Sequence, residues 1–215
     1  MLEYRIVPVT PFQQNCTLLW CGESHRGVIV DPGGEPERIL ATAADAGVVV
    51  EEILLTHGHL DHVGAAGLIA GHLGVPIVGP HPDDAFLLQS LPAQCDMFGF
   101  PRIEPFTTGR WLEHGDRVRV GNVVLDVIHC PGHTPGHLVF FSAADRLAQV
   151  GDVIFRGSIG RTDFPRGNHA QLIASIRSRL FPLGDDVRFI PGHGPMSSIG
   201  LERATNPFVA DAARP

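Results

Sequence analysis

The chain has 215 residues, of which 44% are hydrophobic and 18% charged. This composition is ordinary for a globular protein, excludes disordered and collagen-like chains, and fits a single domain over residues 1–215. The formal net charge is −7, and the positive charge is carried by arginines scattered singly, so no basic stripe predicts a nucleic-acid partner.

In the first half of the chain, apolar segments of strand length alternate with segments of helical periodicity. The predicted strands are residues 4–9, 17–20, 27–30, 48–55 and 75–78. A helix after the third strand has Pro36 near its first turn and ends at Gly47, positions that suit these residue types. A second helix is predicted over residues 62–73, with Gly74 at its end.

The segment at residues 80–111 is rich in Pro, Phe and Gly, and we expect one helix and an ordered loop that shapes a substrate pocket. The second half then has β character. Its predicted strands are residues 117–120, 123–128, 138–141, 147–150 and 187–190. A loop covers residues 151–167, and Asn168 with Gln171 predicts a capping box for one further helix.

Strands outnumber helices, and helices occur both early and late, which predicts the α/β class. No apolar run approaches the ~18 residues of a membrane span, and the N-terminus lacks the pattern of a signal peptide. We therefore expect a cytoplasmic protein without membrane association. The four cysteines form no CxxC pair, and we expect them to be reduced and mostly buried.

Four short loops carry His and Asp side chains, and each loop follows a predicted strand. They are His57, His59, Asp61 and His62 in the first loop, His133 in the second, Asp152 in the third and His193 in the fourth. Loops at strand ends of a rigid scaffold commonly present metal ligands. Gly and Pro beside these side chains fit a backbone that turns sharply and stays fixed.

The spacing in the first loop predicts a metal site. His57 and His59 would point to one side and hold one ion, while Asp61 and His62 would turn toward a second ion nearby. Imidazole nitrogens and carboxylate oxygens suit Zn²⁺, Fe²⁺ or Mn²⁺. Thiolate ligands are absent from these loops, which excludes a structural zinc site of four cysteines. We expect two divalent ions, zinc first and iron or manganese as alternatives.

The remaining histidines are expected to have other roles. His137 lies four residues after His133 and would support the ligands rather than bind metal. We expect surface or structural positions for His25, His72, His81, His114, His129 and His169.

The ordered set of seven His and Asp residues resembles the metallo-β-lactamase superfamily, and it spans almost the whole chain. The resemblance implies an αββα sandwich, in which two mixed β-sheets pack face to face with helices on both outer faces. It also implies the ligand sets. A first ion would bind His57, His59 and His133, a second would bind Asp61, His62 and His193, and Asp152 would bridge both.

Within the superfamily the chain most resembles the glyoxalase II group, the hydroxyacylglutathione hydrolases. The segments at residues 160–165 (GRTDFP) and 191–196 (PGHGPM) resemble its compact bacterial type. That type lacks a C-terminal helical domain, and only 22 residues follow His193 here. A bridging Asp at the position of Asp152 is missing from typical β-lactamases, and the flavodiiron branch has Glu where His59 stands.

This resemblance implies hydrolysis of S-D-lactoylglutathione to D-lactate and glutathione by a metal-bridging hydroxide, with Asp61 as a ligand that also orients the hydroxide. A thiolate, whose conjugate acid has a pKa near ~8.5, leaves without a strong general acid. Two divalent ions keep the site positive despite Asp61 and Asp152, which favours a small anionic substrate such as a glutathione conjugate.

Three further residues are given supporting roles. Arg161 is predicted either to bind a substrate carboxylate or to fix its own loop. Asp163 would orient a ligand histidine or hold Arg161, and Asp31, in a turn after a strand, would support the site.

Other activities stay open at this point. The GRTD segment also resembles the persulfide dioxygenases, which use glutathione persulfide and hold one iron with the first-site residues. Other hydrolases of the fold, such as lactonases, and a metal sensor without turnover are further alternatives. The sequence predicts no oligomeric state.

Overall fold

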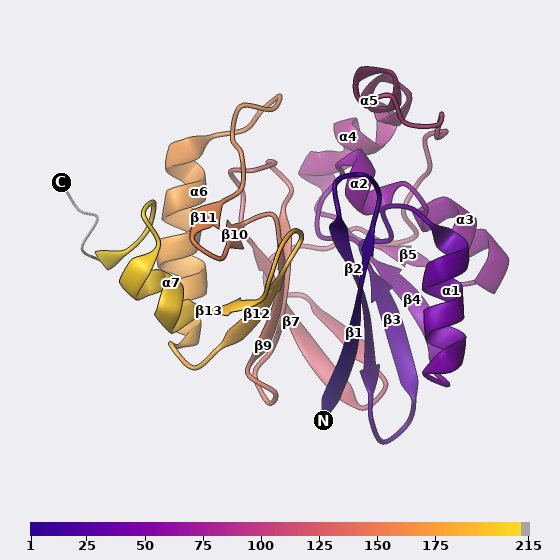
Figure 1. Cartoon of the computed structure of the whole chain (residues 1–215), viewed down its shortest axis with the longest axis horizontal. Helices are drawn as coiled ribbons and strands as arrows, with labels where there is room; N and C mark the ends of the chain where they lie inside the picture. Colours follow the sequence, from indigo (N-terminus) through magenta and orange to yellow (C-terminus); the bar gives the residue numbers. More distant parts are fainter. Residues whose placement is uncertain (212–215) are drawn as a thin grey trace.

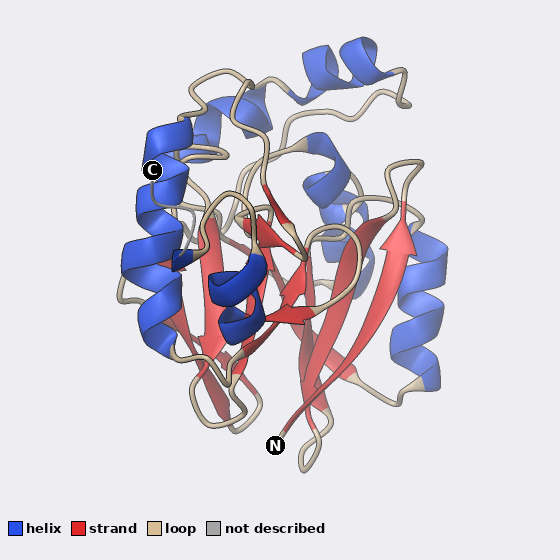
Figure 2. Cartoon of the chain, turned by 60° about the vertical axis from the view of Figure 1, so that its left-hand side comes forward, coloured by secondary structure: helices blue, strands red, loops and turns tan. Residues whose placement is uncertain are grey.

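The computed structural model describes residues 1–211, so residues 212–215 of the predicted domain lie outside the described residues. Two β-sheets pack face to face, with helices on both outer faces (Figures 1 and 2). The helices outside the first sheet are α1 (Pro36–Asp45) and α3 (Ala66–Leu73), and those outside the second are α6 (His169–Ser175) and α7 (Ile199–Thr205). The predicted αββα sandwich is therefore confirmed.

Each sheet mixes parallel and antiparallel pairs. The first has the order β1 (Leu2–Val9), β2 (Gln14–Cys21), β3 (Arg26–Val30), β4 (Val49–Leu54) and β5 (Ile77–Val78). The second has the order β13 (Ser197–Ser198), β12 (Arg188–Pro191), β9 (Leu147–Gly151), β8 (Leu138–Ser142), β7 (Val123–His129) and β6 (Arg117–Val120). The parallel pairs are β3 with β4, β4 with β5, and β9 with β12.

Alternation along the strands fills three apolar layers. In β8, Leu138 and Phe140 belong to the layer between the sheets, whereas Val139 and Phe141 belong to the layer under the outer helices. Successive side chains of a strand point to opposite faces, so a fully apolar strand such as β8 serves both layers. Ile39 of α1 closes the third layer, outside the first sheet.

The helix predicted over residues 62–73 is wrong in one respect, because the structure has two helices there. They are α2 (Leu60–Val63) and α3. The backbone N–H of Ala65 donates to the carbonyl of Pro32 at 2.9 Å instead of continuing the helix. The break ties this segment to the turn after β3 and directs the first loop toward the strand ends.

Residues 80–111 also hold more helix than predicted. A short 3₁₀ turn (Pro82–Asp84) precedes α4 (Ala85–Gln89) and α5 (Leu91–Phe98). Pro92 has no N–H and cannot continue a helix through its position, so the chain breaks at Ser90, between α4 and α5.

Three differences occur in the last third of the chain. The predicted loop at 151–167 contains a small hairpin, β10 (Ile154–Phe155) with β11 (Ser158–Ile159). Asn168 caps α6 as predicted, by accepting the N–H of Gln171 at 3.0 Å, and a π-helical segment, Ile176–Leu180, continues it. The sequence analysis missed β13 and α7, although Ser198 is a favourable N-cap residue and accepts the N–H of Leu201 at 3.2 Å.

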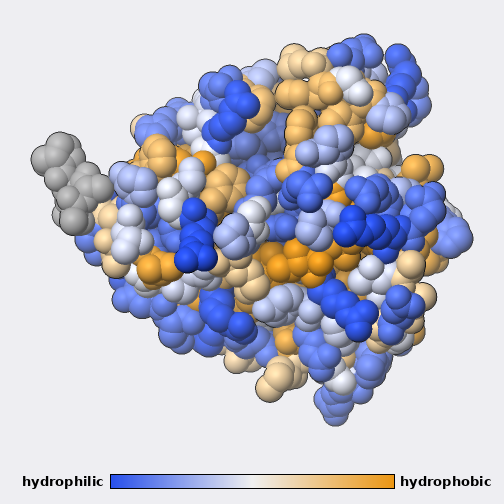
Figure 3. Space-filling view, viewed as in Figure 1, coloured by the Kyte–Doolittle hydropathy of each residue, from blue (hydrophilic) through white to orange (hydrophobic). Residues whose placement is uncertain are grey.

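All four cysteines, which the structure describes, are free and buried, as predicted. Within residues 1–211, no helix combines the length and apolar character that crossing a bilayer requires. Figure 3 shows hydrophilic residues over most of one face, with hydrophobic residues in a band across the middle of the view and near α4 and α5. Met97 and Phe98 of α5 are among the exposed apolar side chains.

Candidate metal centre

The seven predicted ligands lie together at one edge of the sandwich. The first loop follows β4, His133 follows β7, Asp152 follows β9 and His193 follows β12. Both sheets thus contribute side chains, and the site lies where their strand ends meet. Gly192 permits this approach, because a Cβ at its position would lie 2.0 Å from Oδ1 of Asp152.

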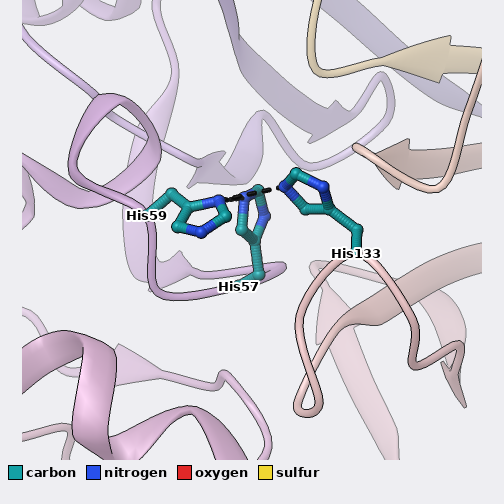
Figure 4. Close-up of side chains that lie close together, drawn as sticks. All are labelled: His57, His59 and His133. Atoms are coloured by element: carbon teal, nitrogen blue, oxygen red, sulfur yellow. Dashed lines mark hydrogen bonds between the residues drawn. The ribbon is translucent and has the colours of Figure 1, made fainter. Parts of the chain in front are cut away.

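A first cluster consists of His57, His59 and His133 (Figure 4). Nδ1 of His59 lies 3.1 Å from Nε2 of His57 and 2.9 Å from Nε2 of His133. Three ring nitrogens that converge in this way leave room for one ion between them after a small outward adjustment, since zinc–imidazole bonds are about 2.0–2.1 Å long.

A second cluster consists of Asp61, His62 and His193. Oδ2 of Asp61 lies 3.2 Å from Nε2 of His193 and 3.8 Å from Nε2 of His62. Asp61 and His62 belong to the same loop as His57 and His59, but α2 turns them toward the other side of the site.

Asp152 lies between the two clusters. Its Oδ1 is 3.3 Å from Nε2 of His62, and its Oδ2 is 3.6 Å from Nε2 of both His133 and His193. One carboxylate therefore reaches side chains of both clusters, as expected for a residue shared by two ions.

The chemistry of these atoms fits divalent metal ions. Nε2 of His62 and Oδ1 of Asp152 are buried, lie 3.3 Å apart without the geometry of a hydrogen bond, and have no other hydrogen-bond partner within residues 1–211. Buried polar atoms are almost always satisfied, and a cation shared by these two would satisfy both. The donor set contains imidazole and carboxylate only, which suits zinc and also iron or manganese.

Hydrogen bonds at the far side of each ring orient the ligands. Nδ1 of His133 donates to the carbonyl of Arg161 at 2.6 Å, and Nδ1 of His193 donates to the carbonyl of Phe12 at 3.1 Å. In both rings Nε2 is then the atom with the lone pair, directed at the site. Such outer contacts fix the tautomer of metal-binding histidines.

Asp31 orients two further predicted ligands, His62 directly and His57 through Thr56. It accepts the hydroxyl of Thr56 at 2.6 Å and lies 3.0 Å from Nδ1 of His62. The Thr56 hydroxyl, which donates to Asp31, is left to accept from Nδ1 of His57 at 3.0 Å. The predicted supporting position of Asp31 agrees with these contacts, whereas the sequence analysis missed Thr56.

The histidines of the two clusters differ in their protonation state. Burial lowers the pKa of His57 well below its usual range and the pKa of His59 to about 3, so both rings are neutral, the form that binds metal. Burial opposes the charged form of His62 as well, but the carboxylates of Asp152 and Asp61 raise its pKa well above the usual value. An ion bound at the second cluster would therefore displace a proton from His62.

His137 lies behind the site, outside both clusters. Its ring stacks on His57 with centroids 4.6 Å apart, and its Nε2 accepts the backbone N–H of Asp152 at 3.0 Å. Both contacts agree with the supporting role predicted for it.

Arg161 and Asp163 do not enter the clusters. Their exposed side chains pair with each other through two hydrogen bonds of 3.0 and 2.7 Å. Of the two roles predicted for Asp163, holding Arg161 is the one that the structure displays. Arg161 contributes to the ligands through its backbone carbonyl on His133.

Asp84 is a buried residue of this region that the sequence analysis missed. Its carboxylate accepts the N–H of Gly58 at 3.0 Å, the N–H of Gly136 at 2.6 Å and the hydroxyl of Thr134 at 2.8 Å. It thus ties the loop of His57 and His59 to the loop of His133. Asn15 has a similar place at the other side, since its amide donates to the carbonyls on both sides of the His193 loop.

Comparison with known proteins places this geometry in context. A family model described as the metallo-beta-lactamase superfamily matches residues 9–193. The hydroxyacylglutathione hydrolase GloC of Haemophilus influenzae is 46% identical over 209 residues, which cover 97% of this chain and 98% of that protein.

Solved structures are similar over nearly the whole chain. The BLEG-1 B3 metallo-beta-lactamase is 31% identical with a TM-score of 0.89, covering 96% of this chain and 99% of that one. The protein TTHA1623, solved in a di-iron-bound form, is 39% identical with a TM-score of 0.87, covering 95% of this chain and 100% of that one.

Proposed function

This chain belongs to the metallo-β-lactamase superfamily, and from that premise we propose that it hydrolyses hydroxyacylglutathione thioesters. Family and relative together make it an enzyme of the metallo-hydrolase type, as the sequence predicted. The finer assignment, S-D-lactoylglutathione to D-lactate and glutathione, is supported by the match to GloC over nearly the full length of both chains.

The observation that carries the proposal is the position of Asp152 between the two clusters. We propose that His57, His59 and His133 hold one divalent ion, that Asp61, His62 and His193 hold a second, and that Asp152 contacts both. Zinc is the first candidate, and the di-iron form of TTHA1623 supports iron as an alternative. Bound divalent ions would lower the pKa of a water and polarise the thioester carbonyl.

The residues of the chain perform the remaining tasks. Asp61 directs Oδ2 at His193, so its other oxygen is available to orient the attacking water. Phe164 lies against His59 and His133, with ring centroids 4.8 and 5.8 Å apart, and limits access of bulk water to the first cluster. The thiolate product needs no strong acid, which favours thioesters over substrates that release an amine.

The test is release of free thiol from S-D-lactoylglutathione by purified protein loaded with zinc or iron, with metal content measured on the same samples. We expect thiol release that His57→Ala abolishes and that His72→Ala, a change at an exposed histidine of α3, leaves intact. Oxygen uptake with glutathione persulfide, or turnover of a β-lactam, without thiol release from the thioester would contradict the proposal.

A further inference from the structure

An arginine occupies a backbone position in the loop before α6 that normally suits glycine. The N–H of Gly167 donates to the carbonyl of Phe164 at 2.9 Å, which closes a turn with Pro165 and Arg166 at its centre. Arg166 has a φ of 64°. In a four-residue turn with Pro at the second position and a positive φ at the third, Gly or Asn is preferred at that third position. Strain kept at a position of this kind points to a use for the side chain.

The side chain of Arg166 is presented in an open, ordered position. Its guanidinium carbon lies 4.1 Å from the centroid of the Phe86 ring of α4, and the side chain has no carboxylate partner within residues 1–211. Arg161, by contrast, is paired with Asp163. Of these two arginines of the loop, Arg166 is therefore the one whose charge is available to a ligand.

Both ends of this contact lie beside the first cluster. Phe164, two residues before Arg166, packs on His59. Leu87, next to Phe86, fills the space at Gly58, where a Cβ would lie 2.7 Å from the Leu87 Cβ. The guanidinium thus connects the loop of Phe164 to α4 at the rim of the cluster that holds His59.

We propose that Arg166, supported on Phe86, is a subsite for a carboxylate of the thiol portion of the substrate. A guanidinium binds a carboxylate through two parallel hydrogen bonds, and its stacking on an aromatic ring leaves less side-chain freedom to lose on binding. In a peptide-like thiol the carboxylates lie two to three residue lengths, roughly 7–10 Å, from the thioester. Arg166 lies two residues from Phe164, which packs on His59, so an anchor there would hold the far end of such a thiol outside the first cluster.

This inference rests on the proposed thioester hydrolysis, and it is tested with two substrates. Steady-state kinetics are measured on S-D-lactoylglutathione and on the uncharged S-lactoyl-N-acetylcysteamine, for the native protein, Arg166→Gly and Arg166→Lys. We expect Arg166→Gly to raise KM for the glutathione thioester about 10-fold with kcat retained, and to leave KM for the uncharged thioester unchanged. Arg166→Lys keeps the positive charge, and its KM for the glutathione thioester should lie between those of the native protein and Arg166→Gly.

Two variants control for the backbone and for the neighbouring charge. Glycine accepts the turn, so the Tm of Arg166→Gly stays within ~4 °C of the native value. Arg146→Gly removes another arginine with positive φ, 50°. Arg146 precedes β9, and Asp152 follows the opposite end of that strand. This variant should change neither KM. Arg161→Gln should change KM less than Arg166→Gly, because Asp163 already balances that charge.

The outcomes separate the two hypotheses. An Arg166→Gly variant that alters both thioesters equally, or neither, overturns the subsite, and so does a larger effect of Arg161→Gln. If the native protein hydrolyses neither thioester, the proposed function itself fails.

Discussion

Replacing Asp84 by alanine is expected to destabilise the protein and to weaken metal binding at the first cluster. The carboxylate is fully buried and accepts three hydrogen bonds, from Gly58, Thr134 and Gly136. Burial opposes the charged form and raises the pKa of Asp84 to about 6, so the cost of the substitution comes from the three buried donors that it leaves unpaired, at about 1–3 kcal/mol each. Because effects within one network do not add fully, we expect a total loss of about 4 kcal/mol in the free energy of unfolding.

The assay is urea and thermal unfolding of zinc-loaded and chelator-treated protein. A loss of this size corresponds to a fall in Tm of about 8–16 °C for a domain of this length. Since Asp84 holds the loops of the first cluster, Asp84→Ala should also weaken zinc binding at that cluster about 10- to 100-fold, as loss of the outer contacts of metal ligands generally does.

Asp83→Ala is the matched control. The neighbouring carboxylate is 60% exposed, and its removal should change stability by no more than about 0.5 kcal/mol. The reasoning is refuted if Asp84→Ala unfolds at the same urea concentration as Asp83→Ala and binds zinc equally well.

Three further predictions concern single residues and pH. Elemental analysis should find that His57→Ala and His62→Ala each lose one of two bound ions; loss of both in either variant would contradict separate clusters. Gln149→Leu should raise the free energy of unfolding by about 1–2 kcal/mol in urea, because both amide atoms are buried without a partner in the described chain; a decrease would refute this. Metal-free protein should be most stable near pH 6.5. Below this pH the unfolded chain protonates His57 but the folded chain does not, because burial lowers the pKa of His57, so stability falls. Above this pH the unfolded chain no longer protonates His62, whose pKa in the folded chain Asp152 and Asp61 raise against burial. The stability that protonated His62 contributes is then lost as the pH rises further. A Tm that rises steadily between pH 5 and 9 would argue against these pKa shifts.

The parts of the site that the sequence predicted share a local signal. His133 and His193 each stand in a Pro-Gly-His segment directly after a strand, and such a signal needs no knowledge of the rest of the fold. The same holds for the strands, whose apolar runs match the two faces that each strand buries.

The parts that were missed depend on contacts between distant segments. Nothing near Asp84 indicates that its carboxylate meets Gly136, 52 residues later, and Thr56 becomes important only because Asp31 lies beside it. The break between α2 and α3 likewise follows from a bond to Pro32. For Arg161 the sequence leaves a substrate anchor and a loop-fixing role open, and only its contact with Asp163 favours the second.

The proposed metal centre would draw its side chains from residues 57 to 193, a separation of 136 residues (193 − 57). At synthesis rates of about 5–20 residues per second, the first histidine emerges roughly 7–27 s before the last. The nascent first half carries two of the three side chains of each cluster, and the third, His133 or His193, follows only later. We therefore expect the second cluster to be completed only after β12 has been made, when the second sheet brings His193 to the site.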